Sequence, residues 1–237
     1  MKVFLAGAAG VVGRRLTILL RRAGHEVAGT TRSEAKAAAL RAIGAVPVLV
    51  DAYDADKLKL AVYAVQPDVI IHQLTDLPQT IDPNTLQSAL AANARLRITG
   101  TRNLIDAALT NNVRRVIAQS IAFAYAPGHA QGQPPLTEDH PIDPAQRGVI
   151  ALERAVTQTP GIDGIVLRYG RFYGPGTWTE VPNSTGPLHV DAAAQAALLA
   201  LTKGKPGIYN IAEDDGAVSS EKAKRDLDFD ASFRIGP

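Results

Sequence analysis

The sequence predicts an α/β fold in which the strands form one parallel sheet. Three observations support this prediction. Short runs rich in β-branched residues alternate with segments of helical periodicity, a pattern typical of right-handed βαβ units. Glycine or proline stands where several of these segments end. The chain has 237 residues, of which 46% are hydrophobic, so it is long enough to bury the core of such a domain.

The first half of the chain shows the alternation most clearly. The run "KVFLA" has the composition of a strand, and the segment that follows it places Leu16 and Leu20 on one helical face. Gly24 is expected to end this helix, and Ser33 to begin the next one. The elements expected here are strand 2–6, helix 11–23, strand 25–30, helix 33–43, strand 46–50, helix 54–65, strand 68–72 and one long helix over 82–109.

The second half continues the pattern with one interruption. Residues 126–144 are rich in Pro, Gly and Gln, so we expect a loop there. Around it we expect strand 113–120, helix 145–157, strand 164–170, helix 191–202, strand 207–212 and a short helix over 219–229.

Composition limits the classes of partner. A net charge of +2 gives no concentrated positive field, so we expect no nucleic acid as partner. Because the sequence contains 0 cysteines, disulfides and zinc–cysteine sites are excluded, and we expect no metal site. No apolar run approaches the roughly 20 residues that a membrane helix needs. We therefore expect a soluble, cytoplasmic protein without a membrane partner.

Three glycines follow the first strand in "GAAGVVG", namely Gly7, Gly10 and Gly13. A strand that turns directly into a helix presents free N–H groups and the positive end of the helix dipole, which attract a phosphate. Glycines there let the backbone turn tightly and approach a pyrophosphate, and let the helix pack on the sheet. Tight helix packing alone would give a similar triplet. The position after the first strand of a βαβ pattern favours dinucleotide binding.

Seven segments occur in a characteristic order along the chain: "GAAGVVGRRL", "DVIIHQL", "GTRNLIDAA", "RRVIAQS", "VLRYGRFYGPG", "HVD" and "GIYNIA". In these segments the chain resembles the extended or atypical branch of the short-chain dehydrogenase/reductase superfamily, the NAD-dependent epimerase/dehydratase group. This resemblance implies a Rossmann-type doubly wound parallel sheet with a reduced C-terminal substrate region. Residues 1–170 would form the dinucleotide-binding domain, and residues 171–237 a small substrate-region segment packed on it. The nicotinamide would lie near the ends of the fourth to sixth strands.

The end of the second strand bears on the choice of cofactor. A site selective for NAD usually has a carboxylate there, but this sequence has Thr30, Thr31 and Arg32. Because Arg32 can pair with a 2′-phosphate, we expect NADP(H) in preference to NAD(H), although Arg32 also fits a solvated loop residue. With the resemblance, the expected cofactor-binding residues are Gly7, Ala9, Gly10, Val11, Val12, Gly13, Arg14, Arg32, Asp51, Ala52, His72, Gln73, Leu74, Asn93, Arg97 and Gln119.

The catalytic pattern of the family is incomplete. Its redox members generally use Tyr-x-x-x-Lys on the helix after the fifth strand, and the matching positions here hold Arg147 and Ala151. Ser120 belongs to the strand end that bears the family's serine, although counting back from Tyr125 puts Ile121 at the usual catalytic position. Tyr125 and Tyr169 come from segments that border the nicotinamide in the family. Arg147 is a candidate for stabilising an oxyanion. The candidate catalytic residues are therefore Ser120, Tyr125, Arg147 and Tyr169.

These observations favour an NAD(P)(H)-dependent oxidoreductase that transfers hydride to or from a small carbonyl or alcohol. The missing Tyr and Lys leave two alternatives: a cofactor-binding sensor or regulatory protein without redox turnover, and a lyase or isomerase that retains the nucleotide. The link "TWTEVPNSTGPL" between Gly176 and His189 is shorter than the family's usual substrate-pocket segment. A small molecule is the expected partner, and a homodimer is an option that the sequence leaves open.

Overall fold

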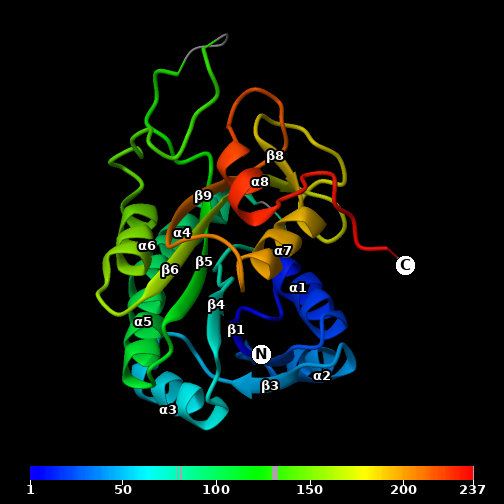
Figure 1. Ribbon diagram of the computed structural model, residues 1–237, viewed down its shortest axis with the longest axis vertical. Coiled ribbons are helices and arrows are strands. Elements are labelled where there is room, and N and C mark those ends of the chain that lie inside the picture. Colours follow the sequence, from blue (N-terminus) through cyan, green and yellow to red (C-terminus); the bar gives the residue numbers. More distant parts are fainter. Residues whose placement is uncertain (79, 81, 130–132, 237) are drawn as a thin grey trace.

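In the computed structural model, which describes residues 1–78, 80, 82–129 and 133–236, a sheet of seven parallel strands runs through the molecule (Figure 1). Its strand order is β3-β2-β1-β4-β5-β6-β9. The strands are β1 (Lys2–Ala6), β2 (Glu26–Thr31), β3 (Val46–Leu49), β4 (Val69–His72), β5 (Arg115–Ile121), β6 (Asp163–Tyr169) and β9 (Gly207–Ile211). The α/β prediction is thus confirmed, with each strand close to its expected range.

Helices cover both faces of this sheet (Figure 1). Along β1, Val3 and Leu5 point to one face, while Phe4 and Ala6 point to the other, and all four are buried. Helices α1 (Val11–Arg22), α2 (Glu34–Ala42) and α7 (Val190–Leu199) cover the first face, with α1 packed on α7. Helices α3 (Ala55–Val65), α5 (Thr101–Thr110) and α6 (Arg147–Gln158) cover the second. This arrangement confirms the doubly wound architecture.

The strand order reverses between β1 and β4. From β1 the chain moves outward to β2 and β3, then returns to the other side of β1 as β4, with Ala6 beside His72 in the register. In open α/β sheets, ligands bind in the crevice outside the carboxyl ends of the strands at such a switch point. The strand order therefore predicts a ligand site at the segments that follow β1 and β4.

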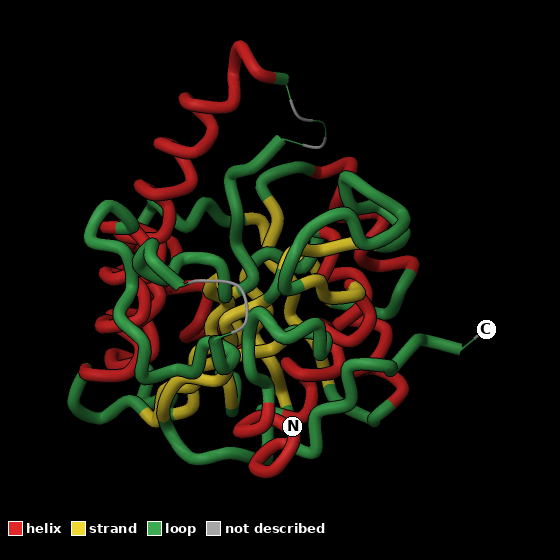
Figure 2. The backbone as a smooth tube through the Cα atoms, turned by 90° about the horizontal axis from the view of Figure 1, so that it is seen from above, coloured by secondary structure: helices red, strands yellow, loops and turns green. Residues whose placement is uncertain are grey.

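The long helix expected over 82–109 is not a single α-helix. The structure has α4 (Pro83–Arg95), a π-helix η1 (Leu96–Gly100) and then α5. Periodicity alone did not reveal this interruption, because a π-turn adds only one residue to a helical turn. Figure 2 shows α4 extending away from the rest of the molecule, and Asn93 is its one buried residue.

The C-terminal segment adds a small sheet that the sequence did not predict. Strands β7 (Arg171–Tyr173) and β8 (Pro187–His189) pair in parallel, and α8 (Glu221–Leu227) follows β9. Residues of α7 and α8 share one hydrophobic core with α1, while the division at residue 170 stays a prediction. Part of the expected loop 126–144 is held by bridges from Tyr125 to Ile142 and from Leu136 to Val218, and residues 130–132 lie outside the described ranges.

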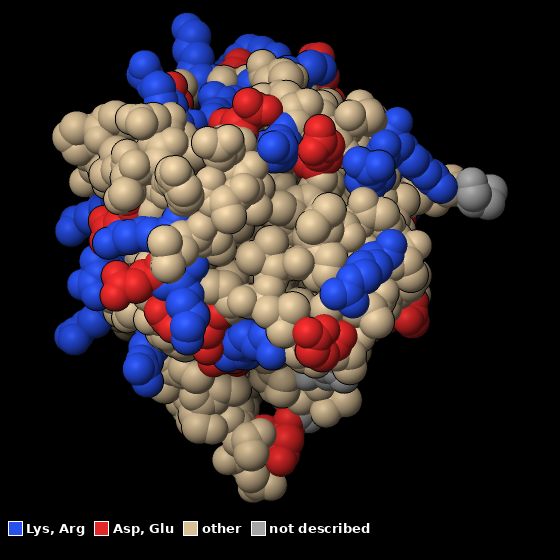
Figure 3. All heavy atoms as spheres, turned by 90° about the horizontal axis from the view of Figure 1, so that it is seen from below, with Lys and Arg blue, Asp and Glu red and all other residues tan. Residues whose placement is uncertain are grey.

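The surface carries charges of both signs. Figure 3 shows Lys and Arg interspersed with Asp and Glu on the face seen from below. None of the helices in the described ranges has the length and apolarity that a membrane crossing requires.

Candidate functional site

The segment that runs from the end of β1 into the first turns of α1 accommodates only glycine at two positions. Gly7 has φ +88°, and a Cβ built on it would lie 2.5 Å from the Gln73 carbonyl oxygen. A Cβ on Gly13 would lie 2.2 Å from the Gly7 carbonyl oxygen. The Gly7 N–H donates to Thr30 Oγ1 at 3.1 Å, and the Gly10 N–H donates to the Gly7 carbonyl at 3.0 Å. The turn is therefore tight and internally braced.

The first turn of α1 has the properties of an anion-binding site. Gly10 is its N-cap, no side chain caps it, and no acidic residue lies in the first turn. The N–H groups of a helix's first turn have no intrahelical acceptor, and the helix dipole places partial positive charge there. The unoccupied N–H groups and the uncapped positive end of α1 suit a diphosphate, while Gly7 and Gly13 let the chain pack closely around this turn.

An acidic residue lies near the end of β2 after all, brought there by the fold. Asp76, from the segment after β4, forms an ion pair with Arg32 at 3.4 Å, and 61% of the Arg32 side chain is exposed. Asp51 accepts the Tyr53 N–H at 3.0 Å and so shapes the turn after β3, and the Ala52 carbonyl accepts from Asn103 at 2.8 Å. The preference for NADP(H), which rested on Arg32 without a nearby acid, therefore stays a prediction.

His72, at the end of β4, is a buried neutral side chain. Its Nδ1 accepts the Leu74 N–H at 3.1 Å, so Nε2 carries the proton and donates to Thr101 Oγ1 at 3.0 Å. Burial, with a smaller contribution from the Arg97 charge, lowers the pKa of His72 to about 3. Both ring nitrogens are thus occupied in holding the segment after β4.

The residues after His72 are also held by side-chain hydrogen bonds. The Leu74 carbonyl accepts from Gln119 at 3.1 Å, and the Gln73 amide donates to the Tyr169 hydroxyl at 3.2 Å. Asn93 accepts the Asp76 N–H at 3.0 Å. The structure therefore brings together most of the expected cofactor-binding residues at the carboxyl ends of β1, β4 and β5.

Arg97 differs from these residues because its charge has no partner. It lies in η1 and is partly buried, and its side chain makes no hydrogen bond or ion pair with the residues that the structure describes. Burial lowers the pKa of its guanidinium, an effect that the Glu153 carboxylate partly opposes. Its guanidinium nitrogens are not among the buried unsatisfied atoms, so solvent reaches them.

Two of the candidate catalytic residues, Ser120 and Tyr125, use their hydroxyl groups as hydrogen-bond donors to acceptors inside the protein. Ser120 donates to Glu153 Oε1 at 2.7 Å, and Tyr125 donates to Asn210 Oδ1 at 2.6 Å. Arg168 holds both Glu153 oxygens, at 2.9 and 2.7 Å, and also donates to the Tyr125 hydroxyl at 3.0 Å. Burial raises the pKa of Tyr125. These contacts describe a buried polar network, and catalytic roles for Ser120 and Tyr125 stay predictions.

The other two candidates lie in contrasting surroundings. Tyr169 is 1% exposed, and burial raises its pKa well above the ordinary value, although the Gln73 hydrogen bond opposes this. Arg147 is exposed at the start of α6. Their catalytic roles also stay predictions.

Sequence reasoning missed the buried pair of Glu153 and Arg168, which are 5% and 3% exposed. A charged residue in the apolar strand "VLRYG" was the available signal, because buried charges are nearly always paired. The identity of the partner depended on the fold.

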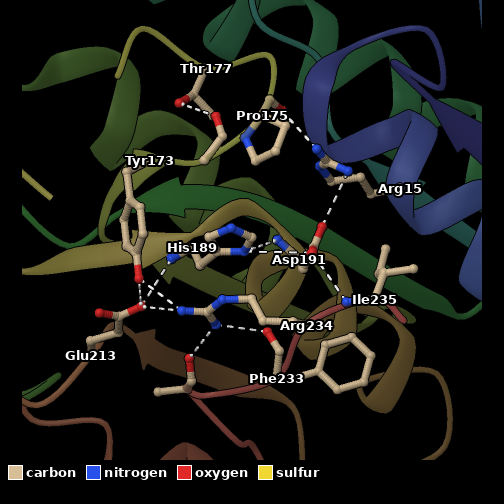
Figure 4. Close-up of polar contacts among 12 residues, drawn as sticks. Arg15, Tyr173, Pro175, Thr177, His189, Asp191, Glu213, Phe233, Arg234 and Ile235 are labelled. Atoms are coloured by element: carbon tan, nitrogen blue, oxygen red, sulfur yellow. Dashed lines mark hydrogen bonds and ion pairs between the residues drawn. The ribbon is translucent and has the colours of Figure 1, made fainter. Parts of the chain in front are cut away.

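A second polar cluster connects α1 to the C-terminal segment (Figure 4). Arg15 pairs with Asp191 at 3.2 Å and donates to the Pro175 carbonyl at 2.8 Å. In the same cluster the Tyr173 hydroxyl donates to Glu213 at 2.7 Å, and Arg234 donates to the Tyr173 hydroxyl at 2.8 Å. These contacts fix the turn after β7 beside the start of α1.

That turn also reaches the segment after β4. A Cβ on Gly176 would lie 3.8 Å from the Arg14 guanidinium, and the Trp178 indole donates to the Pro78 carbonyl at 3.1 Å. The glycine turn is therefore flanked on one side by residues 174–178.

The strand order and the glycine turn at the switch point define a Rossmann-type α/β protein. Comparison with known proteins identifies the family: residues 3–186 match the NAD dependent epimerase/dehydratase family. The chain belongs to this family.

Relatives and solved structures agree with this assignment. A 3-diazoavenalumate denitrifying reductase of a Streptomyces species is 37% identical, over 93% of this chain and 79% of the relative. A ketoreductase of Stigmatella aurantiaca is 26% identical, over 92% of this chain and 69% of the relative. The UDP-glucose 4-epimerase of Thermotoga maritima shares the fold with a TM-score of 0.81 at 17% identity, covering 99% of this chain and 94% of that one.

Proposed function

We propose that this protein is an NAD(P)H-dependent reductase that acts on a small electrophilic molecule, with NADPH as the preferred cofactor. The observation that carries the proposal is the braced glycine turn at the switch point, where the uncapped first turn of α1 suits a diphosphate. The similarity to a reductase at 37% identity supports reduction over epimerisation.

The cofactor-binding role falls to residues at the strand ends. The first turn of α1 would hold the diphosphate, Arg32 would face the adenosine ribose, and the segment 72–74 would line the inner ribose. When bound, the reduced nicotinamide would supply a hydride to an electrophilic carbon, and one proton would complete the reduction of a carbonyl to an alcohol.

The source of that proton decides between two classes of acceptor. The chain has Arg147 and Ala151 where the family has its proton-donating Tyr and its Lys, while Ser120 and Tyr125 donate inward. Reduction of a carbonyl here would have to take its proton from water or from another hydroxyl, which forgoes the roughly 10²–10⁴-fold contribution of general acid catalysis.

An aromatic diazonium group is the second candidate acceptor. The Streptomyces relative is named for denitrifying a diazo compound. When hydride replaces the diazonium nitrogen on an aromatic carbon, N₂ leaves with the electron pair of its bond, and charge balances without added acid. The absent Tyr and Lys favour this reaction, because it needs no proton donor.

The experiment combines binding and turnover. Calorimetry with NADPH and NADH tests cofactor binding, and loss of nicotinamide absorbance with aldehyde, ketone and arenediazonium panels tests turnover. Turnover of a carbonyl or a diazonium compound supports reduction. Tight cofactor binding without turnover would favour a sensor, and a product formed without net cofactor consumption would favour a lyase or isomerase. Failure to bind either cofactor would refute the proposal.

A further inference from the structure

An unpartnered cation lies close to the strand ends where a substrate would bind. Arg97 belongs to η1, whose π-turn separates α4 from α5, and such turns occur often at functional sites. Its charge interacts with His72, at the end of β4, and with Glu153, which binds Ser120 of β5. Arg97 therefore lies beside the carboxyl ends of β4 and β5, on the side of the sheet covered by α6.

The neighbouring groups make no hydrogen bond to the Arg97 side chain. Glu153 instead accepts from Ser120 and Arg168 at Oε1, and from Arg168 at Oε2. The His72 ring accepts the Leu74 N–H at one nitrogen and donates at the other. A guanidinium has five N–H donors and no acceptor, so those of Arg97 are left for solvent or a ligand.

The local charge is also unbalanced. Arg97 and Arg168 carry two positive charges, and Glu153 is the one carboxylate whose attraction raises the pKa of Arg97. A net positive charge in partly desolvated surroundings attracts an anion more strongly than the same charge in water. Solvent reaches the guanidinium nitrogens of Arg97, so an acceptor that replaced solvent there would meet free N–H donors.

We propose that Arg97 binds a carboxylate of the substrate, and so selects anionic acceptors. The planar guanidinium forms paired hydrogen bonds to a carboxylate, which fix the ligand's orientation as well as its charge. The diphosphate already has its own cradle at α1, on the other side of the β1–β4 switch point. This inference rests on the proposed reductase function, and it adds the class of substrate.

The test uses matched pairs of probes on the cofactor-saturated protein. Benzoate and benzamide differ in charge at nearly equal shape, and calorimetry gives their affinities without any turnover. 4-Carboxybenzaldehyde and its methyl ester provide the same comparison in the turnover assay. The variants are Arg97→Met, which removes the charge, and Arg97→Lys, which keeps it. Arg102→Met is the control, because Arg102 is exposed on α5.

We expect the wild type and Arg102→Met to bind benzoate more tightly than benzamide. Arg97→Met should weaken benzoate binding about tenfold or more, as expected for loss of a hydrogen bond to a charged group, while benzamide binding stays unchanged. Arg97→Lys should retain part of the preference. Because the Arg97 charge has no partner, Arg97→Met should unfold at no lower a temperature than the wild type, which shows that the variant is folded.

Three results would overturn the inference: no preference for benzoate in the wild type, an unchanged preference in Arg97→Met, or a loss of cofactor affinity in place of benzoate affinity. The two proposals fail separately. If the carboxylate preference depends on Arg97 but no acceptor is reduced, the reductase function fails and the anion site stands. If both aldehydes are reduced equally well, the reductase function stands and the anion site fails.

Discussion

Removal of the Glu153 carboxylate should destabilise the protein severely. Glu153 and Arg168 are 5% and 3% exposed, with contacts of 2.7 and 2.9 Å, and Glu153 also accepts from Ser120. Breaking a buried ion pair from one side costs about 3–5 kcal/mol, because the remaining charge is left buried without a partner. Glu153→Ala should therefore remove a large share of the free energy of unfolding, which is roughly 5–15 kcal/mol for a typical protein.

The assay is equilibrium unfolding in urea, with variants that separate charge from packing. Glu153→Gln keeps an acceptor for Ser120 and should cost less than Glu153→Ala. The double variant Glu153→Leu/Arg168→Met removes both charges, and should recover most of the loss, since apolar replacement of a buried pair is often neutral. A cost below about 1 kcal/mol for Glu153→Ala, the value typical of an exposed pair, would refute this reasoning.

Three further predictions concern the glycine turn, the buried histidine and the cofactor. Gly7→Ala should abolish cofactor binding and destabilise the fold. The control Gly24→Ala, at φ +80° with open space around it, should lower the free energy of unfolding by only about 1–2 kcal/mol. Equal losses for the two variants in urea unfolding would contradict the steric argument. The folded-state pKa of His72, about 3, lies below its ordinary value of 6.5, so between these pH values the unfolded chain binds more protons than the folded one. The free energy of unfolding should therefore fall as the pH decreases through this range, by up to about 1.4 kcal/mol per pH unit. His72→Gln should flatten this dependence, and an unchanged slope would show that other groups cause it. Arg32→Ala should weaken NADPH binding in calorimetry. Asp76→Asn frees Arg32 from its ion pair, and should raise the ratio of NADPH affinity to NADH affinity up to about fivefold. A lower ratio in Asp76→Asn than in the wild type would argue against a 2′-phosphate at Arg32.

The sheet and the glycine turn could be predicted because their signals are local. Each strand and helix depends on a short run of residues, and the glycine spacing follows from the requirements of one turn. The π-turn at 96–100 could not be predicted, because the helical pattern continues through it with only a small change of phase. One extra residue nevertheless decides which side of the helix Arg97 occupies.

The charge pairs were beyond the sequence for a different reason. Arg32 and Asp76 are 44 positions apart, and Glu153 and Arg168 are 15 apart on different elements. The apolar run around Arg168 signals a buried charge, but it does not name the partner, and only the assembled fold shows which of these residues meet. The same holds for Arg15 and Asp191, which join α1 to α7.

These pairings determine the electrostatic character of the strand ends. Asp76, Glu153 and Asp191 are paired there with Arg32, Arg168 and Arg15 respectively, while Asp51, after β3, accepts the Tyr53 N–H and forms no ion pair with the described residues. Two positive groups near the ends of β1 and β4 also lack a partner within the described ranges: the first turn of α1 and the guanidinium of Arg97. Because these two groups are free, they favour anionic ligands at two separate positions. One position fits a diphosphate, and the other is the position we assign to a substrate carboxylate.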